Sequence, residues 1–301
     1  MEDFLQHLLN GLNLGAIYAL IALGYTMVYG VLQLINFAHS EVYMVGAFST
    51  YYASRWLGLS SKPGLASFGI ALVIAMVVCS LLGLAIERFA YRPLRNSPKL
   101  NVLITAIGVS LFLQFSGQVV FGSDPKLFPA VLEDYTLPFN FGQVQIQLFD
   151  IVILAVACIA MTGLHFFIHK TKTGKASRAV SHSPRVAALM GISVNRMISI
   201  TFIIGSSLAG IGAVLVGLKY PKIEPLMGMM IGMKAFVAAV LGGIGNLPGA
   251  VLGGILMGVC EEFVVGYLSS AYRDALAFGL LILILLLKPS GLLGKSTVEK
   301  V

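Results

Sequence analysis

Long apolar segments follow one another along nearly the whole chain, separated by short polar stretches. An apolar helix needs about 20 residues to cross the hydrocarbon core of a bilayer. On this criterion we expect membrane segments at residues 12–32, 35–57, 65–87, 101–121, 148–169, 197–219, 231–246, 249–268 and 272–288. The seventh is short and rich in glycine, which is typical of a broken or re-entrant element. The pattern predicts an all-α, polytopic transmembrane helix bundle of eight or nine spans.

Composition supports lipid as the solvent of this bundle. Of the 301 residues, 57% are hydrophobic and 11% are charged, and the mean hydropathy is +0.90. Soluble domains carry about 25% charged residues, and a soluble fold of this size cannot bury so much apolar surface. Residues 1–301 are therefore expected to form one membrane domain. Cys79, Cys158 and Cys260 lie far apart in apolar segments, which argues against a metal site or a disulfide framework.

The net charge of +7 is unevenly distributed. Thirteen of the 20 lysines and arginines fall within 88–99, within 170–196 or in the tail from residue 288, whereas acidic residues gather at the N-terminus and within 124–150. This asymmetry is typical of cytoplasmic against external loops. It places the N-terminus outside and the C-terminus in the cytoplasm. No interleaving of basic and aromatic residues indicates nucleic-acid binding.

Polar and ionisable side chains interrupt the second apolar segment between Gln33 and Gly46. Such groups are costly in a membrane and usually face the bundle interior or a wet cavity. At 100° per residue, one helical stripe contains Asn36, His39, Ser40 and Tyr43. We interpret this stripe as a candidate lining of a substrate pathway; the alternative is an interhelical hydrogen-bond network. Glu41 is expected to point roughly the opposite way.

A second candidate is the glycine-rich stretch 242–254, which contains Asn246 and Pro248. Short helices interrupted by glycine and proline often mark binding regions of transporters. The alternative is a tight helix-turn-helix at the membrane face. In the eighth span, Glu261 and Glu262 are either a proton site or structural residues near the outer interface, where they are hydrated or paired with Arg273 or Lys234.

The basic segment 170–192 is expected to lie in the cytoplasm and to contain a short helix over 184–190. Ser183 suits its N-cap, Pro184 its first turn and Gly191 the position after its end. An ordered helix in a cytoplasmic loop indicates a docking surface for a partner, whereas the alternative is a loop that only sets topology. The sequence Gly291–Thr297 imitates the end of a phosphate-binding loop, but the spacing and context of that motif are missing. We therefore expect no ATP site in this chain and no enzyme activity.

Four stretches together resemble the LivH-type permeases of high-affinity branched-chain amino acid ABC transporters. They are Gly24–Gly30 (GYTMVYG), Ile35–His39 (INFAH), Glu87–Arg95 (ERFAYRPLR) and Val240–Gly249 (VLGGIGNLPG), and the resemblance extends over essentially the whole chain. The glycine-rich stretch alone is shared with related sugar and urea permeases.

The resemblance implies a multi-pass protein of the bacterial inner membrane that forms half of a pathway for leucine, isoleucine and valine. It implies a second permease similar to LivM, two ATPases similar to LivG and LivF that bind ATP-Mg, and a periplasmic binding protein. It also implies ATPase coupling by the 170–192 loop. The coupling candidates there are Gly174, Arg178, Arg185, Ala187, Ala188 and Gly191. The family's coupling element usually has three residues between its second alanine and its glycine, whereas this chain has two.

Two rival functions fit a polytopic membrane protein. A proton-coupled secondary transporter would use Glu41 or Glu261 as its proton site. A passive channel would conduct a small neutral solute such as urea. A pore subunit without an ATP site needs external energy to pump, and this favours the importer hypothesis.

Overall fold

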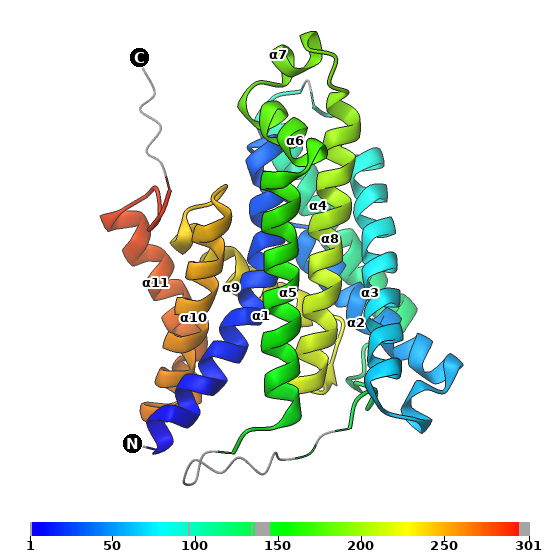
Figure 1. Cartoon of the computed structure of the whole chain (residues 1–301), viewed down its shortest axis with the longest axis vertical. Coiled ribbons are helices and arrows are strands. Elements are labelled where there is room, and N and C mark those ends of the chain that lie inside the picture. Colours follow the sequence, from blue (N-terminus) through cyan, green and yellow to red (C-terminus); the bar gives the residue numbers. More distant parts are fainter. Residues whose placement is uncertain (1, 96, 134, 136–144, 295–301) are drawn as a thin grey trace.

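The computed structural model describes residues 2–95, 97–133, 135 and 145–294. In this part of the chain, helices dominate (Figure 1). The α-helices are α1 (Glu2–Leu32), α2 (His39–Leu57), α3 (Leu65–Ile86), α4 (Lys99–Phe121), α5 (Leu148–Lys170), α6 (Lys172–His182), α7 (Pro184–Leu189), α8 (Val194–Lys219), α9 (Met227–Gly242), α10 (Leu247–Tyr267) and α11 (Arg273–Leu287). Two 3-10 turns, η1 (Leu59–Ser61) and η3 (Ser270–Tyr272), and a π-helical turn, η2 (Glu87–Tyr91), complete the helical elements.

The predicted fold class is confirmed. Within the described residues, seven helices are long and apolar enough to cross a membrane: α1, α3 with η2, α4, α5, α8, α10 and α11 with η3. The remaining two expected spans correspond to α2 and α9. Helix α2 has 19 residues and includes Glu41 and Arg55. Helix α9 has 16 residues, a length of about 24 Å at 1.5 Å per residue, which is shorter than the hydrocarbon core.

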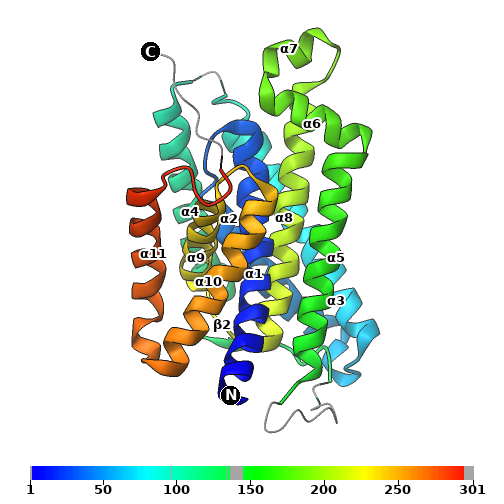
Figure 2. The same cartoon turned by 60° about the vertical axis from the view of Figure 1, so that its left-hand side comes forward.

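Helices α1 and α8 form the centre of the bundle. Within the most apolar 18 residues of each helix, 89% of the residues of α1 and 78% of those of α8 are buried. The corresponding shares are 22% in α4 and 11% in the segment formed by η3 and α11. Helix α1 packs against α10, α8 and α9, and α8 packs against α3 and α2 (Figures 1 and 2). The apolar outer faces of α3, α4, α5 and α11 are therefore left for lipid or for a partner subunit.

The two ends of the bundle differ in chemistry. Helices α6 and α7 extend beyond the bundle at the end where α11 finishes, and the basic 88–99 segment lies at this same end (Figures 1 and 2). The N-terminal end of α1 lies at the opposite end, where strands β1 (Lys126–Leu127) and β2 (Lys222–Ile223) pair antiparallel. The described residues of the three basic segments predicted to be cytoplasmic thus share one end of the molecule.

Glycines let α1 and α10 approach backbone to backbone, as the small-residue spacing predicts. A Cβ added to Gly15 would lie 2.7 Å from the Cα of Ile255, and one added to Gly254 would lie 2.5 Å from the Cα of Ala19. Gly11 and Gly258 belong to the same contact. Close helix packing replaces a hydrophobic driving force, which is absent between helices in lipid.

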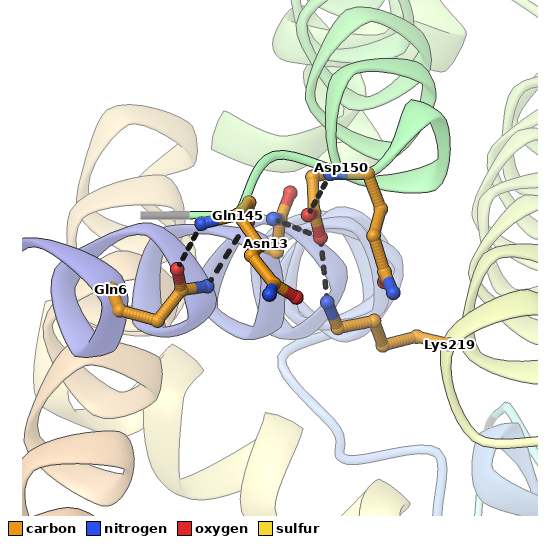
Figure 3. A network of polar contacts seen from close by, with 6 residues as sticks. Gln6, Asn13, Gln145, Asp150 and Lys219 are labelled. Atoms are coloured by element: carbon orange, nitrogen blue, oxygen red, sulfur yellow. Dashed lines mark hydrogen bonds and ion pairs between the residues drawn. The ribbon is translucent and has the colours of Figure 1, made fainter. Parts of the chain in front are cut away.

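A polar network ties α1, α5 and α8 together near the N-terminal end (Figure 3). Asp150, at the start of α5, accepts a hydrogen bond from Asn13 Nδ2 at 2.9 Å and forms an ion pair with Lys219 Nζ at 2.6 Å. Gln6 exchanges two hydrogen bonds with the backbone of Gln145, at 2.9 and 3.3 Å. Asp150 is buried, so its charge depends on these contacts.

Replacing Gly15 with Ala should destabilise the protein. The added methyl meets backbone atoms of α10, which cannot move aside like a flexible side chain, so the cost is about 1–3 kcal/mol. The matched control is Gly163→Ala in α5, where an added Cβ meets no atom within 4 Å. The control should be neutral or slightly stabilising. Midpoints of thermal unfolding in detergent measure both; equal midpoints for the two variants would contradict the packing account.

Replacing Lys219 with Met should lower the unfolding free energy by about 2–3 kcal/mol, because it leaves a buried carboxylate without its cation. The comparison is Lys222→Met, which removes the 3.1 Å ion pair between Lys222 and Glu224. The Lys222 side chain is 65% exposed and the Glu224 side chain is 39% exposed. An exposed pair contributes about 0–1 kcal/mol. Chemical unfolding of both variants tests the difference, and a Lys219→Met protein as stable as Lys222→Met would show that the Asp150 pair does not stabilise the bundle.

Candidate functional site

The helical structure is interrupted between α1 and α2, and α2 begins inside the bundle. The His39 ring occupies the space beside Gly24, well before α1 ends at Leu32. Helix α2 was expected to begin at residue 35, but it begins at His39. The reason is tertiary: Tyr91 of η2 donates a hydrogen bond to Asn36 Oδ1 at 3.0 Å and so fixes the segment before the helix. Asn36 is therefore not part of a helical stripe.

The N-terminus of α9 meets the N-terminus of α2. A Cβ added to Gly228 would lie 2.6 Å from the carbonyl oxygen of Ser40, and one added to Gly232 would lie 3.0 Å from the Cα of Ser40. The short seventh element predicted at 231–246 is thus a helix that starts four residues earlier, at Met227, and ends at Gly242. Gly243 and Gly245 follow with φ of 105° and 91°, values that favour glycine.

A cavity of about 310 Å³ lies beside this junction. Its walls come from α1, α2, α4, α9 and α11 and from the segment before α2. The lining residues are Tyr25, Phe37, Ser40, Glu41, Ile107, Ser110, Leu111, Gln114, Met229, Met233, Phe236, Val237, Phe278 and Leu281. Mostly apolar walls with a few polar groups are typical of sites for small molecules.

The structure brings one of the five predicted pathway residues, Ser40, to this cavity. Asn36 is buried against Tyr91, and His39 is buried between α1 and α2, its ring 4.7 Å from that of Tyr25. Tyr43 is fully buried in the core. Of these three residues only Asn36 takes part in an interhelical hydrogen bond, because neither ring nitrogen of His39 and not the hydroxyl of Tyr43 has a partner among the described residues. A role of these residues in transport stays a prediction.

Asn246 lies at the helix boundary between α9 and α10, away from the cavity. Its Oδ1 accepts a hydrogen bond from the backbone N–H of Gly249 at 3.4 Å, and its Nδ2 donates to the carbonyl of Leu293 at 2.6 Å. Asn246 is thus the N-cap of α10, with Pro248 in the first turn. The glycine-rich stretch forms a tight turn between two helices at the end of the bundle.

Glu41 and two residues of α4 were not predicted to lie together. Glu41 lines the cavity beside Ser40, although the helical projection placed it on the opposite face. Ser110 and Gln114 of α4 line the same cavity. Ser110 and Gln114 are four residues apart in an apolar span, so they lie on one helix face. This spacing is the sequence signal from which a polar face of α4 could have been predicted.

Glu261 and Glu262 are paired, as the structural alternative predicted. Lys234 contacts Glu261 at 2.9 Å, and Arg273 contacts Glu261 at 3.2 Å and Glu262 at 3.8 Å. Tyr18 also donates to Glu261, at 2.9 Å. The pairing links α1, α9, α10 and the start of α11.

The expected docking segment is more ordered than predicted, because α6 (Lys172–His182) precedes the short helix. Helix α7 has the expected capping, since Ser183 Oγ accepts from the Val186 N–H at 3.3 Å, Pro184 is in the first turn and Gly191 has a φ of 80°. Gly174 is buried where α6 packs on the end of α5: a Cβ there would lie 2.6 Å from the Cα of Ile168.

The other coupling candidates divide by exposure. Ala187 is buried, whereas the remaining four are exposed: Arg178, Arg185, Ala188 and Gly191. Large apolar side chains of α7 are also exposed, with Val186 at 58%, Leu189 at 83% and Met190 at 78%. This apolar surface at the end of the bundle is typical of a protein contact.

Known protein sequences match this chain along nearly its whole length. The family model "Branched-chain amino acid transport system / permease component" matches residues 7–285. The high-affinity branched-chain amino acid transport system permease protein BraD of Pseudomonas aeruginosa is 46% identical over 308 residues, which cover 99% of this chain and 98% of BraD. The corresponding protein LivH of Escherichia coli K12 is 44% identical over 304 residues, with 99% and 98% coverage.

A more distant relative also covers most of the chain. The probable branched-chain amino acid transport permease LivH of Methanocaldococcus jannaschii is 27% identical over 289 residues, which cover 91% of this chain and 88% of that protein. These matches include the break before α2, the α9–α10 turn and the α6–α7 segment. The chain therefore belongs to the family of permease components of branched-chain amino acid transport systems.

Proposed function

We propose that this chain is one of two permease subunits of an ATP-driven importer for leucine, isoleucine and valine, and that the cavity beside α2 and α9 is its share of the pathway. The near full-length identity to BraD and LivH is the observation that supports this most strongly. The cavity chemistry agrees, because a branched aliphatic side chain needs apolar walls and the charged end of an amino acid needs a few polar groups. A periplasmic binding protein delivers the substrate.

Energy enters from two ATPases similar to LivG and LivF, which bind ATP-Mg, while a permease similar to LivM supplies the other half of the pathway. The surface of α6 and α7 is where we place the ATPase contact. Its exposed apolar residues, Val186, Leu189 and Met190, offer a hydrophobic anchor. Ser181 of α6 donates to the carbonyl of Gly30 in α1, so movement of this segment acts directly on the core of the bundle.

A series of polar contacts connects the start of α8, at the α6–α7 end of the bundle, with the segment before α2. At the beginning of α8, Asn195 contacts Arg95, which forms an ion pair with the buried Glu87. Glu87 also accepts from Ser199 Oγ at 2.8 Å. Since η2 contains both Glu87 and Tyr91, and Tyr91 holds Asn36, displacement of α8 reaches the segment that positions α2. In this proposal, ATP binding switches the bundle between two packings through these contacts.

The orientation follows from charge. The described residues of all three basic segments lie at the end of α6 and α7, which we assign to the cytoplasm of a bacterial inner membrane by the positive-inside rule. The N-terminus then lies outside and the C-terminus inside. The α6–α7 surface is thereby accessible to cytoplasmic ATPases.

Of the two candidate proton sites of a secondary transporter, Glu261 is engaged by two cations, which leaves it poorly suited to release and rebind a proton during transport. Glu41 has no cation partner among the described residues, so uptake measurements decide between the functions. Leucine uptake driven by a pH gradient without ATP would favour a secondary transporter. Passive flux of urea that leucine does not inhibit would favour a channel.

Replacing Leu189 with Glu should abolish coupling. The reconstituted four-subunit complex should hydrolyse ATP faster when a leucine-loaded binding protein is added, and the variant should lose at least tenfold of this stimulation, because a charge is buried at the ATPase contact. Leu189→Met keeps the apolar surface and should behave like the wild type. Undiminished stimulation in Leu189→Glu would remove α7 from the coupling surface.

A further inference from the structure

Buried acidic side chains in the described part of the chain are almost all paired with cations. Arg95 pairs with Glu87 and Lys219 with Asp150, while Glu261 and Glu262 both contact Arg273. Glu41 is the exception: it is 1% exposed, and no lysine, arginine or histidine nitrogen of the described residues lies within 4.0 Å of its carboxylate.

Hydrogen bonds do not compensate for the missing cation. The Ser40 hydroxyl lies 3.3 Å from Glu41 Oε1 but 2.8 Å from the carbonyl of Phe37. A hydroxyl has one proton to donate, and the shorter distance favours the carbonyl. Glu41 Oε2 has no hydrogen-bond partner among the described residues. A buried carboxylate in this condition is under-satisfied, so the structure is prepared for a positively charged group.

The space next to Glu41 defines which positively charged group fits. The cavity of about 310 Å³ is small, and α9 contributes Met229, Met233 and Phe236 to its wall. Methionine side chains adapt to differently shaped apolar groups, which suits the different branching of leucine, isoleucine and valine. Ser110 and Gln114 of α4 line the same cavity and offer hydroxyl and amide groups to a bound amino acid.

We propose that Glu41 binds the α-ammonium group of the amino acid during its passage through the permease, while the side chain of the substrate lies against Met229, Met233 and Phe236. This inference rests on the function proposed above and adds to it a specific substrate-binding residue. It predicts discrimination against molecules that have the same carbon skeleton but lack the ammonium group. An ammonium that meets the carboxylate inside the bundle replaces the lost hydration of both groups.

The first test is Glu41→Gln in the four-subunit complex, reconstituted in proteoliposomes. Leucine uptake should fall at least tenfold, while the loaded binding protein still stimulates ATP hydrolysis. Glu41→Asp should recover part of the uptake, and the exposed Glu224→Gln should match the wild type. Wild-type uptake by Glu41→Gln, or loss of uptake and of ATPase stimulation together in an assembled complex, would overturn the proposal.

A second measurement uses the wild-type complex and so does not depend on the folding of a variant. Dicyclohexylcarbodiimide modifies carboxyl groups in apolar surroundings, and peptide mass spectrometry locates the adduct on Glu41. Leucine should slow this modification several-fold, whereas 4-methylpentanoate, which lacks the ammonium group, should not. Equal protection by both compounds overturns the proposal. So does a Glu41 that never reacts, which would indicate a permanent cation from the partner permease.

These outcomes are separable from failure of the proposed function. If the wild-type complex does not import leucine in response to ATP, the importer assignment itself is wrong. If it does import leucine and Glu41→Gln imports it equally well, only the role of Glu41 is wrong.

Discussion

The site depends on the contact between α9 and the first turn of α2. Because Gly228 and Gly232 have no side chains, the backbone of α9 approaches Ser40 closely enough for two helix N-termini to meet inside the bundle. Irregular backbone at membrane depth is tolerated where protein or a cavity surrounds it, and here both do. The cavity and Glu41 both lie beside this contact.

Buried ion pairs of the interior serve as fixed links between helices. Asp150 with Lys219 holds α5 to α8, and Glu261 with Lys234 holds α10 to α9. In a medium of low dielectric constant such pairs are costly to break, so they set which helices move as a unit. The α2–α9 junction has no ion pair among the described residues, although α9 is tied to α10 by Lys234. Its two helices are joined by glycine packing, which allows them to separate at lower cost.

The sequence predicted the bundle, its spans and the charge asymmetry of its ends, because apolar length and basic loops are local properties. It also predicted the capping of α7 by Ser183 and the pairing of Glu261 with Lys234 or Arg273. It could not predict that α2 begins at His39, since the contact that fixes Asn36 comes from Tyr91, 55 positions away. For the same reason a helical projection separated Glu41 from Ser40, whereas the walls of α4 and α9 bring both to one cavity. Whether a side chain faces a site depends on the positions of the neighbouring helices, and the periodicity of a single segment gives no information about those positions.

The central claim is that the cavity at the α2–α9 junction belongs to the translocation pathway, and the accessibility of Ser110 tests it most directly. In the assembled importer, Ser110→Cys, in a chain whose native cysteines are replaced by serine, is treated with a membrane-impermeant thiol reagent, with and without trapped ATP. The account predicts that reactivity changes between the two states and that leucine protects the thiol. A thiol that is unreactive in both states, or that reacts only with a reagent dissolved in lipid, would place the cavity outside the pathway and contradict the account.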